Sequence, residues 1–140
     1  MTNVDVQHLA DRYIALWVEP DTALRRGAVE SLWAPDGAHV LHPPVAIREA
    51  ADSLGFASGS LRACGHDAIE TRVVRSYEKF VASGEYTFRS RQDAVGLEDV
   101  VKFSWEMVPV AGGEAVGGGV EFLVLDQDGR ISADYMFPGL

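Results

Sequence analysis

The last third of the chain alternates apolar and polar residues with a period of two, which is typical of half-buried strands. One side of segment 101–108 carries four apolar residues, Val101, Phe103, Trp105 and Met107. Segments 119–125 and 131–137 are also rich in strand-forming residues, and glycine-containing turns separate the three segments. Three successive strands joined by short turns predict an antiparallel meander.

The first 56 residues instead repeat their apolar residues at helical spacing. We predict three helices here. The first is capped by Thr2 or Asn3 and has an apolar stripe from Val6 to Trp17, the second is capped by Asp21 and has a buried side that extends to Trp33, and the third covers about residues 46–54. We predict three further strands, over residues 38–42, 68–77 and 80–91. Helices followed by a meander predict an α+β domain, in which the helices pack on one face of a curved sheet.

Length and charge exclude several classes of protein. A chain of 140 residues is sufficient for one domain, 1–140, with a core of its own. A net charge of −9 argues against binding nucleic acid. No apolar run is long enough to span a bilayer, and the first residues lack the basic start and apolar stretch of a signal peptide, so we expect a cytoplasmic protein with no membrane partner.

Metal and cofactor sites are not predicted. The single Cys64 cannot form an internal disulfide or supply a pair of zinc ligands. No histidine–carboxylate spacing typical of a metal centre is present. The three glycines at 117–119 precede no helix, so we interpret them as a bulge that bends the sheet and not as a phosphate-binding loop.

Short motifs resemble a known superfamily over nearly the whole chain. Segments 12–17 (RYIALW), 32–37 (LWAPDG) and 42–44 (HPP) are similar to the amino-terminal half of nuclear transport factor 2-like proteins. Segments 103–105 (FSW), 119–122 (GVEF) and 128–131 (DGRI) resemble their carboxy-terminal half, in the SnoaL-like polyketide cyclase and ketosteroid isomerase-like branches. The resemblance implies a cone-shaped curved antiparallel sheet with about three amino-terminal helices, in many members a homodimer.

The same resemblance suggests catalytic residues. Ketosteroid isomerase uses a carboxylate base that precedes a proline, together with an early-helix tyrosine and a late-strand acid that polarise the substrate carbonyl. Tyr13, His42 and Glu121 fall at the corresponding positions, with histidine in place of the aspartate base. Related cyclases place a catalytic aspartate on a late strand, which makes Asp134 a fourth candidate.

The residues themselves leave alternatives open. Glu121 lies on a strand that is apolar on both faces, so its carboxyl must be paired, protonated or turned toward a wet cavity. Tyr13 fits an ordinary core position, and His42 could cap a turn or face solvent. His39 is out of phase with His42, so we predict that it takes the opposite side of its strand.

We therefore predict a cofactor-free enzyme of isomerase or cyclase type that acts on an apolar carbonyl compound. His42 would abstract a proton beside the carbonyl, while Tyr13 and Glu121 would stabilise the enolate oxygen. The predicted pocket lining is Trp17, Trp33, Phe56, Leu123 and Met136. The alternatives are a non-catalytic binding protein for a small hydrophobic ligand and a dimeric interaction module.

One apolar sheet face should remain uncovered by the helices. We predict that Phe103, Trp105 and Met107 lie on this face and form a homodimer interface.

Overall fold

The computed structural model describes residues 5–43 and 61–139 of the chain. The described helices are α1 (Val6–Trp17), α2 (Thr22–Leu32) and α4 (His66–Ser76), and a π-helical turn η1 (Tyr77–Val81) continues α4. The strands are β1 (Trp33–Leu41), β2 (Leu61–Cys64), β3 (Tyr86–Ser90), β4 (Val95–Leu97), β5 (Val100–Pro109), β6 (Gly117–Leu125) and β7 (Ile131–Pro138). Among these helices, none combines the length and the apolar character needed to cross a bilayer.

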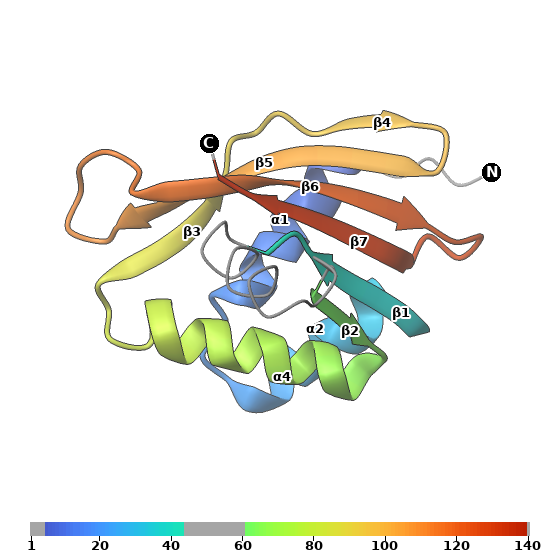
Figure 1. Cartoon of the computed structure of the whole chain (residues 1–140), viewed down its shortest axis with the longest axis horizontal. Coiled ribbons are helices and arrows are strands. Elements are labelled where there is room, and N and C mark those ends of the chain that lie inside the picture. Colours follow the sequence, from blue (N-terminus) through green and yellow to red (C-terminus); the bar gives the residue numbers. More distant parts are fainter. Residues whose placement is uncertain (1–4, 44–60, 140) are drawn as a thin grey trace, which may run out of the picture.

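The strands form one curled, unclosed sheet in the order β2-β1-β7-β6-β5-β3, and β4 pairs with β5. Figure 1 shows the helices gathered on one side of this sheet. The predicted α+β class and the β5-β6-β7 meander are confirmed. The sheet is mixed and not wholly antiparallel, because β1 runs parallel to β7.

Two capping aspartates start the amino-terminal helices. The side chain of Asp5 accepts a hydrogen bond from the backbone N–H of His8, and that of Asp21 accepts one from Leu24. The apolar stripe of α1 then packs into the core, with Leu9, Tyr13 and Leu16 each at most 4% exposed. This packing brings the hydroxyl of Tyr13 to the inner face of the sheet.

The strand predicted over residues 68–77 is wrong, because this segment is α4. Ile69 and Val73 lie one helical turn apart, and both are buried. Their β-branched side chains favour a strand in isolation, but packing against the core overrides that preference. Of the strand predicted over 80–91, only Tyr86–Ser90 is extended. The helix predicted over 46–54 lies outside the described residues.

The predicted dimer face is also wrong, because Phe103, Trp105 and Met107 point inward. Phe103 is fully buried, and its ring centroid lies 5.3 Å from that of Tyr13. Trp105 and Met107 line an internal cavity. The outward face of the same sheet carries the neighbouring set, which includes Phe122 and the exposed Phe137.

The glycines at 117–119 do not form the predicted bulge, since β5 and β6 stay in regular register across them. Gly119 lies opposite Trp105, and a Cβ atom at Gly119 would come within 2.7 Å of the indole. The irregular register in this part of the sheet falls instead between Val124 and Leu125. Gly119 therefore makes room for the indole of Trp105 on the facing strand.

We predict opposite effects for two glycine-to-alanine substitutions. Gly119→Ala should lower the free energy of unfolding by about 1–3 kcal/mol, because the new methyl group overpacks against Trp105. Gly27→Ala should raise it by roughly 0.5–1 kcal/mol, because Gly27 is an exposed residue of α2 with nothing within 4 Å of the added Cβ. Urea unfolding measures both values, and equal effects would contradict the close packing at Gly119.

Candidate active site

A cavity of about 370 Å³ lies between the helices and the inner face of the sheet. Its sheet wall is mainly apolar and aromatic, with side chains from Leu41, Phe88, Trp105, Met107 and Met136. The described polar residues that line it are Tyr13, His39, Arg72, Ser76 and Lys79. This volume and this mixture of an apolar wall with a few polar groups are typical of a small-molecule site.

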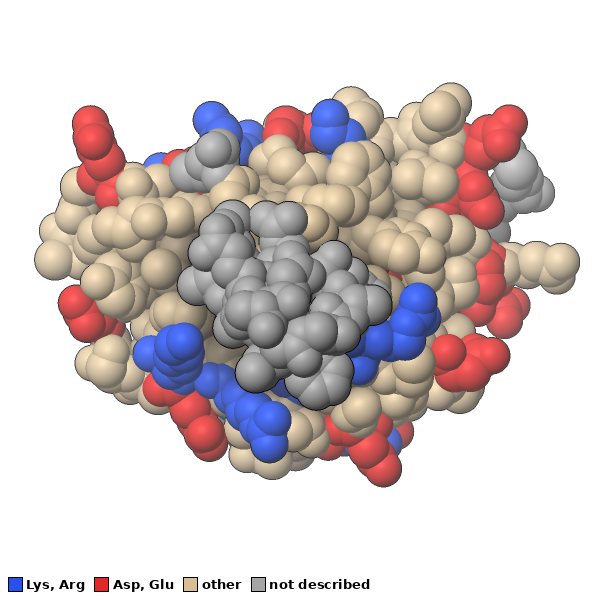
Figure 2. Space-filling model, in the orientation of Figure 1, with Lys and Arg blue, Asp and Glu red and all other residues tan. Residues whose placement is uncertain are grey.

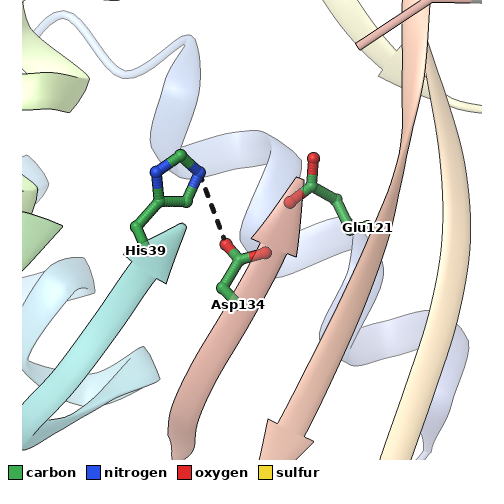
Figure 3. Close-up of side chains that lie close together, drawn as sticks. All are labelled: His39, Glu121 and Asp134. Carbon is green, nitrogen blue, oxygen red and sulfur yellow. Dashed lines mark ion pairs between the residues drawn. The ribbon is translucent and has the colours of Figure 1, made fainter. Parts of the chain in front are cut away.

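Three buried titratable side chains lie together on adjacent strands beside the cavity. His39 on β1 pairs with Asp134 on β7, and Glu121 follows on β6 (Figure 3). His39 is 1% exposed, and both carboxyl groups are fully buried. Buried ionisable groups are costly unless they are paired or neutral, so their hydrogen bonds determine their protonation.

The hydroxyl of Tyr13 bridges the two carboxyl groups. It lies 2.6 Å from Oδ2 of Asp134 and 2.9 Å from Oε1 of Glu121. A phenol has only one proton to donate, so one of the two carboxyl groups must itself donate a proton to Tyr13. The other oxygen of Glu121, Oε2, accepts a hydrogen bond of 2.8 Å from the indole N–H of Trp105.

Glu121 is the protonated member of the pair. Burial raises the pKa of Glu121 well above its usual value, and the neighbouring Asp134 raises it further. Burial, reinforced by both carboxyl groups, likewise raises the pKa of Tyr13. The proton order is therefore Glu121 to Tyr13 and Tyr13 to Asp134.

Arg72 determines the tautomer of His39. Its Nη1 lies 3.0 Å from Nδ1 of His39, and a guanidinium can only donate, so Nδ1 accepts. Burial lowers the pKa of His39, an effect that Asp134 opposes and Arg72 reinforces. The neutral ring therefore carries its proton on Nε2, which lies 3.7 Å from Oδ2 of Asp134. That distance is too long for a hydrogen bond, and Nε2 has no partner among the described residues.

The structure brings three of the four predicted catalytic residues together and leaves the fourth outside. Tyr13, Glu121 and Asp134 form the hydrogen-bonded group described above. His42 is exposed, and its ring stacks on Phe137 at 5.7 Å. His39 takes the opposite side of β1, as its phase predicts, but this side faces inward, so His39 supplies the imidazole of the cavity.

The predicted ligand-binding residues divide in the same way. Trp17 and Met136 line the cavity, and the ring of Trp17 lies 5.4 Å from that of His39. Trp33 and Leu123 are fully buried in the core and are not among the lining residues. Phe56 lies outside the described residues.

Sequence reasoning missed the polar residues of the helical wall. Arg72, Ser76 and Lys79 are spaced at i, i+4 and i+7, which places them on one side of a helix. The helical spacing could have revealed them, but the strand predicted over 68–77 ended before Lys79, so the three residues were not predicted to share one face.

His39, Glu121 and Asp134 could in principle hold a metal ion. One ligand atom from each lies within 4.8 Å of the others. Both oxygens of Glu121 already accept or share hydrogen bonds, with Tyr13 and Trp105. Among the described atoms of this group, only Nε2 of His39 and Oδ1 of Asp134 lack a partner. The hydrogen bonds with Tyr13 and Trp105 therefore account for both oxygens of Glu121 without a metal ion.

We predict that Glu121→Gln preserves stability, since an amide donates and accepts where the protonated carboxyl does. Near pH 4.5, the usual pKa of glutamate, its free energy of unfolding should lie within about 1 kcal/mol of the wild type. At higher pH Glu121 ionises in the unfolded chain but not in the folded one, so wild-type stability falls. The free energy of unfolding of Glu121→Gln, relative to that of the wild type, should therefore rise by up to about 1.4 kcal/mol per pH unit until the pH reaches the pKa of Glu121 in the folded protein. Urea unfolding at several pH values measures this difference.

Tyr13→Phe provides the contrast for this measurement. It removes the only described hydrogen-bond donor between the two buried carboxyl groups, and it should cost about 2 kcal/mol or more at neutral pH. A loss of stability in Glu121→Gln equal to that in Tyr13→Phe would contradict the assignment of a protonated Glu121. A pH-independent difference between Glu121→Gln and the wild type would contradict it as well.

Solved structures share this fold. A candidate isomerase of the SnoaL-like family from Agrobacterium tumefaciens superposes with a TM-score of 0.75 at 24% identity, covering 96% of this chain and 97% of that one. A SnoaL-like protein of unknown function from Burkholderia thailandensis gives a TM-score of 0.68 at 15% identity, covering 100% and 99%. A phenazine biosynthesis-related protein from Pseudomonas aeruginosa gives 0.56 at 14%, covering 96% and 82%.

No protein-family model and no curated protein matches the chain by sequence. The structural similarity covers nearly the whole chain, so it confirms at the level of fold the resemblance that the motifs indicate. The chain has the nuclear transport factor 2-like fold that these solved structures share.

Proposed function

We propose that the protein is a small-molecule enzyme of isomerase or cyclase type, which performs acid–base chemistry on an apolar carbonyl compound. The observation that carries the proposal is a neutral histidine, His39, in the wall of an apolar cavity with the buried carboxylate of Asp134 behind it. A neutral imidazole is the side chain best suited to accept a proton near neutral pH. The structural similarity to a candidate isomerase agrees with this chemistry.

In this proposal His39 takes the role that the sequence suggested for His42. The lone pair of the neutral ring is on Nδ1, which Arg72 contacts in the free protein. Substrate would displace this contact, and Nδ1 would then accept a proton from the carbon beside the substrate carbonyl. The imidazolium that forms would be stabilised by Asp134, toward which Nε2–H points.

Tyr13 and Glu121 act as positioning residues in this mechanism. The single proton of Tyr13 is directed to Asp134, so it is not free to bind an enolate oxygen. Glu121 supplies the hydrogen bond that fixes the direction of the Tyr13 hydroxyl. Together they hold the Asp134 carboxylate in place beside His39.

A binding protein without catalytic activity is the second candidate, because the lone pair of His39 is occupied by Arg72 in this structure. If Arg72 kept that contact in the complex, the cavity would hold a ligand without transferring a proton.

Deuterium exchange distinguishes the two candidates. We expect the wild type to catalyse uptake of deuterium from D₂O beside the carbonyl of cyclic ketones that bind in the cavity, as measured by proton NMR. His39→Gln should lower the rate by about a hundredfold or more, since general base catalysis contributes that much. Exposed His8 on α1 offers a matched control, so His8→Gln should exchange at the wild-type rate.

Two results would overturn this assignment. A comparable loss in His42→Gln, with full activity in His39→Gln, would return the role of base to His42. No wild-type exchange on any bound ketone would leave the binding protein as the function.

We also propose a homodimer, now through the outward face of the sheet. Phe122, Tyr135 and Phe137 lie together on this face, and Tyr135 and Phe137 are 39% and 45% exposed. Phe122→Glu should convert a dimer into a monomer in light scattering, because it buries a charge at the centre of the interface. A monomeric wild type at micromolar concentration would refute the proposal.

A further inference from the structure

One wall of the cavity presents a row of hydrogen-bond donors. Arg72, Ser76 and Lys79 succeed one another along α4 and η1, and all three line the cavity. A guanidinium and an ammonium can only donate, and a serine hydroxyl can donate as well. We call these three residues the donor row. The opposite wall, on the sheet, is apolar and aromatic apart from His39.

The donor row has no acidic counterpart on the described cavity wall. No aspartate or glutamate is among the described lining residues, although the chain holds 21 acidic and 12 basic residues. Neither Arg72 nor Lys79 takes part in an ion pair with a described carboxylate. Figure 2 shows Lys and Arg side chains over the α4 half of the visible face, where Asp and Glu side chains also lie, and further Lys and Arg side chains along the upper edge. The described lining residues therefore carry a net positive charge, opposite in sign to that of the chain.

Within the described part of the chain, one edge of the Arg72 guanidinium makes no hydrogen bond. Nη1 donates to Nδ1 and the carbonyl of His39 and to the carbonyl of Leu61, at 3.0–3.2 Å. In the hydrogen bonds of the described residues, Nε and Nη2 make none. Two parallel N–H groups on one edge match the two oxygens of a carboxylate. Burial also lowers the pKa of Arg72, so an anion bound there would relieve the cost of its charge.

We propose that the cavity binds an apolar carboxylic acid, with its carboxylate on the donor row and its apolar body against the sheet. This inference rests on the proposed function and names its substrate class, a keto acid. Arg72 touches His39, so a carboxylate on Arg72 places the carbons next to it beside the proposed base. Lys79 and Ser76 extend the same charge complementarity along the helix.

A matched pair of probes tests the charge requirement. 2-Naphthoate and 2-naphthamide have almost the same shape, but only the first is an anion. Isothermal titration calorimetry with the full chain at pH 7 should show about tenfold or tighter binding of 2-naphthoate, since charge-assisted hydrogen bonds are roughly twice as strong as neutral ones. Raising the salt concentration should weaken binding of the naphthoate only.

Three variants locate the effect. Lys79→Gln changes an exposed side chain and should fold normally, yet it should reduce the preference for naphthoate over naphthamide severalfold. Arg72→Gln should abolish the preference. Arg75→Gln is the control, because exposed Arg75 lies on the same helix but is not among the lining residues, so the preference should remain.

The outcomes separate this inference from the proposed function. Equal binding of both probes to the wild type, or an unchanged preference in Lys79→Gln and Arg72→Gln, would refute the carboxylate site while leaving base catalysis by His39 to the exchange experiment. If Arg75→Gln lost the preference for naphthoate to the same extent, the preference would come from the general charge of the protein surface, and the carboxylate site would also be refuted. Binding of neither probe would overturn both the carboxylate site and the small-molecule cavity.

Discussion

The arrangement of the core depends on one proton, that of the Tyr13 hydroxyl. Two buried carboxyl groups contact this hydroxyl, and like charges so close together cannot both remain ionised in an apolar surrounding. The protonation of Glu121 resolves the conflict, because the protonated carboxyl group donates a hydrogen bond to the Tyr13 hydroxyl oxygen. Helix α1 and strands β6 and β7 are thereby linked by hydrogen bonds with a defined direction.

Asp134 connects this network to His39, and His39 connects it to Arg72. Asp134 faces the imidazole of His39, and Arg72 contacts the far nitrogen of the same ring. This sequence of a carboxylate, an imidazole and a guanidinium leads from the core to the cavity wall. It is possible only because β1 runs parallel to β7 and sets His39 directly beside Asp134.

Much of the fold could be predicted from the sequence, because the meander has strong period-two alternation and short turns. The unusual position of Glu121 could be predicted too, since a carboxylate on a strand with two apolar faces has few alternatives. The histidine that faces the cavity could not be predicted from the sequence. His39 and His42 differ in phase, but which of them faces inward depends on the pairing of β1 with β7, a contact between residues far apart in the sequence. The prediction of a strand in the α4 segment was wrong for a related reason. The β-branched residues of this segment favour a strand, and only their packing against the core makes the segment helical.

The register of β5 against β6 connects the remaining errors. Phe103 lies directly opposite Glu121, and residues that face each other across an antiparallel pair share one side of the sheet. A position of Glu121 in the cavity and a position of Phe103 on the surface therefore exclude each other. Placing Glu121 inside also places Trp105 inside, opposite Gly119, whose missing side chain makes room for the indole. The indole N–H can then donate a hydrogen bond to Glu121. Gly119, which the sequence predicts to be part of a bulge, therefore supports the hydrogen-bond network around Tyr13.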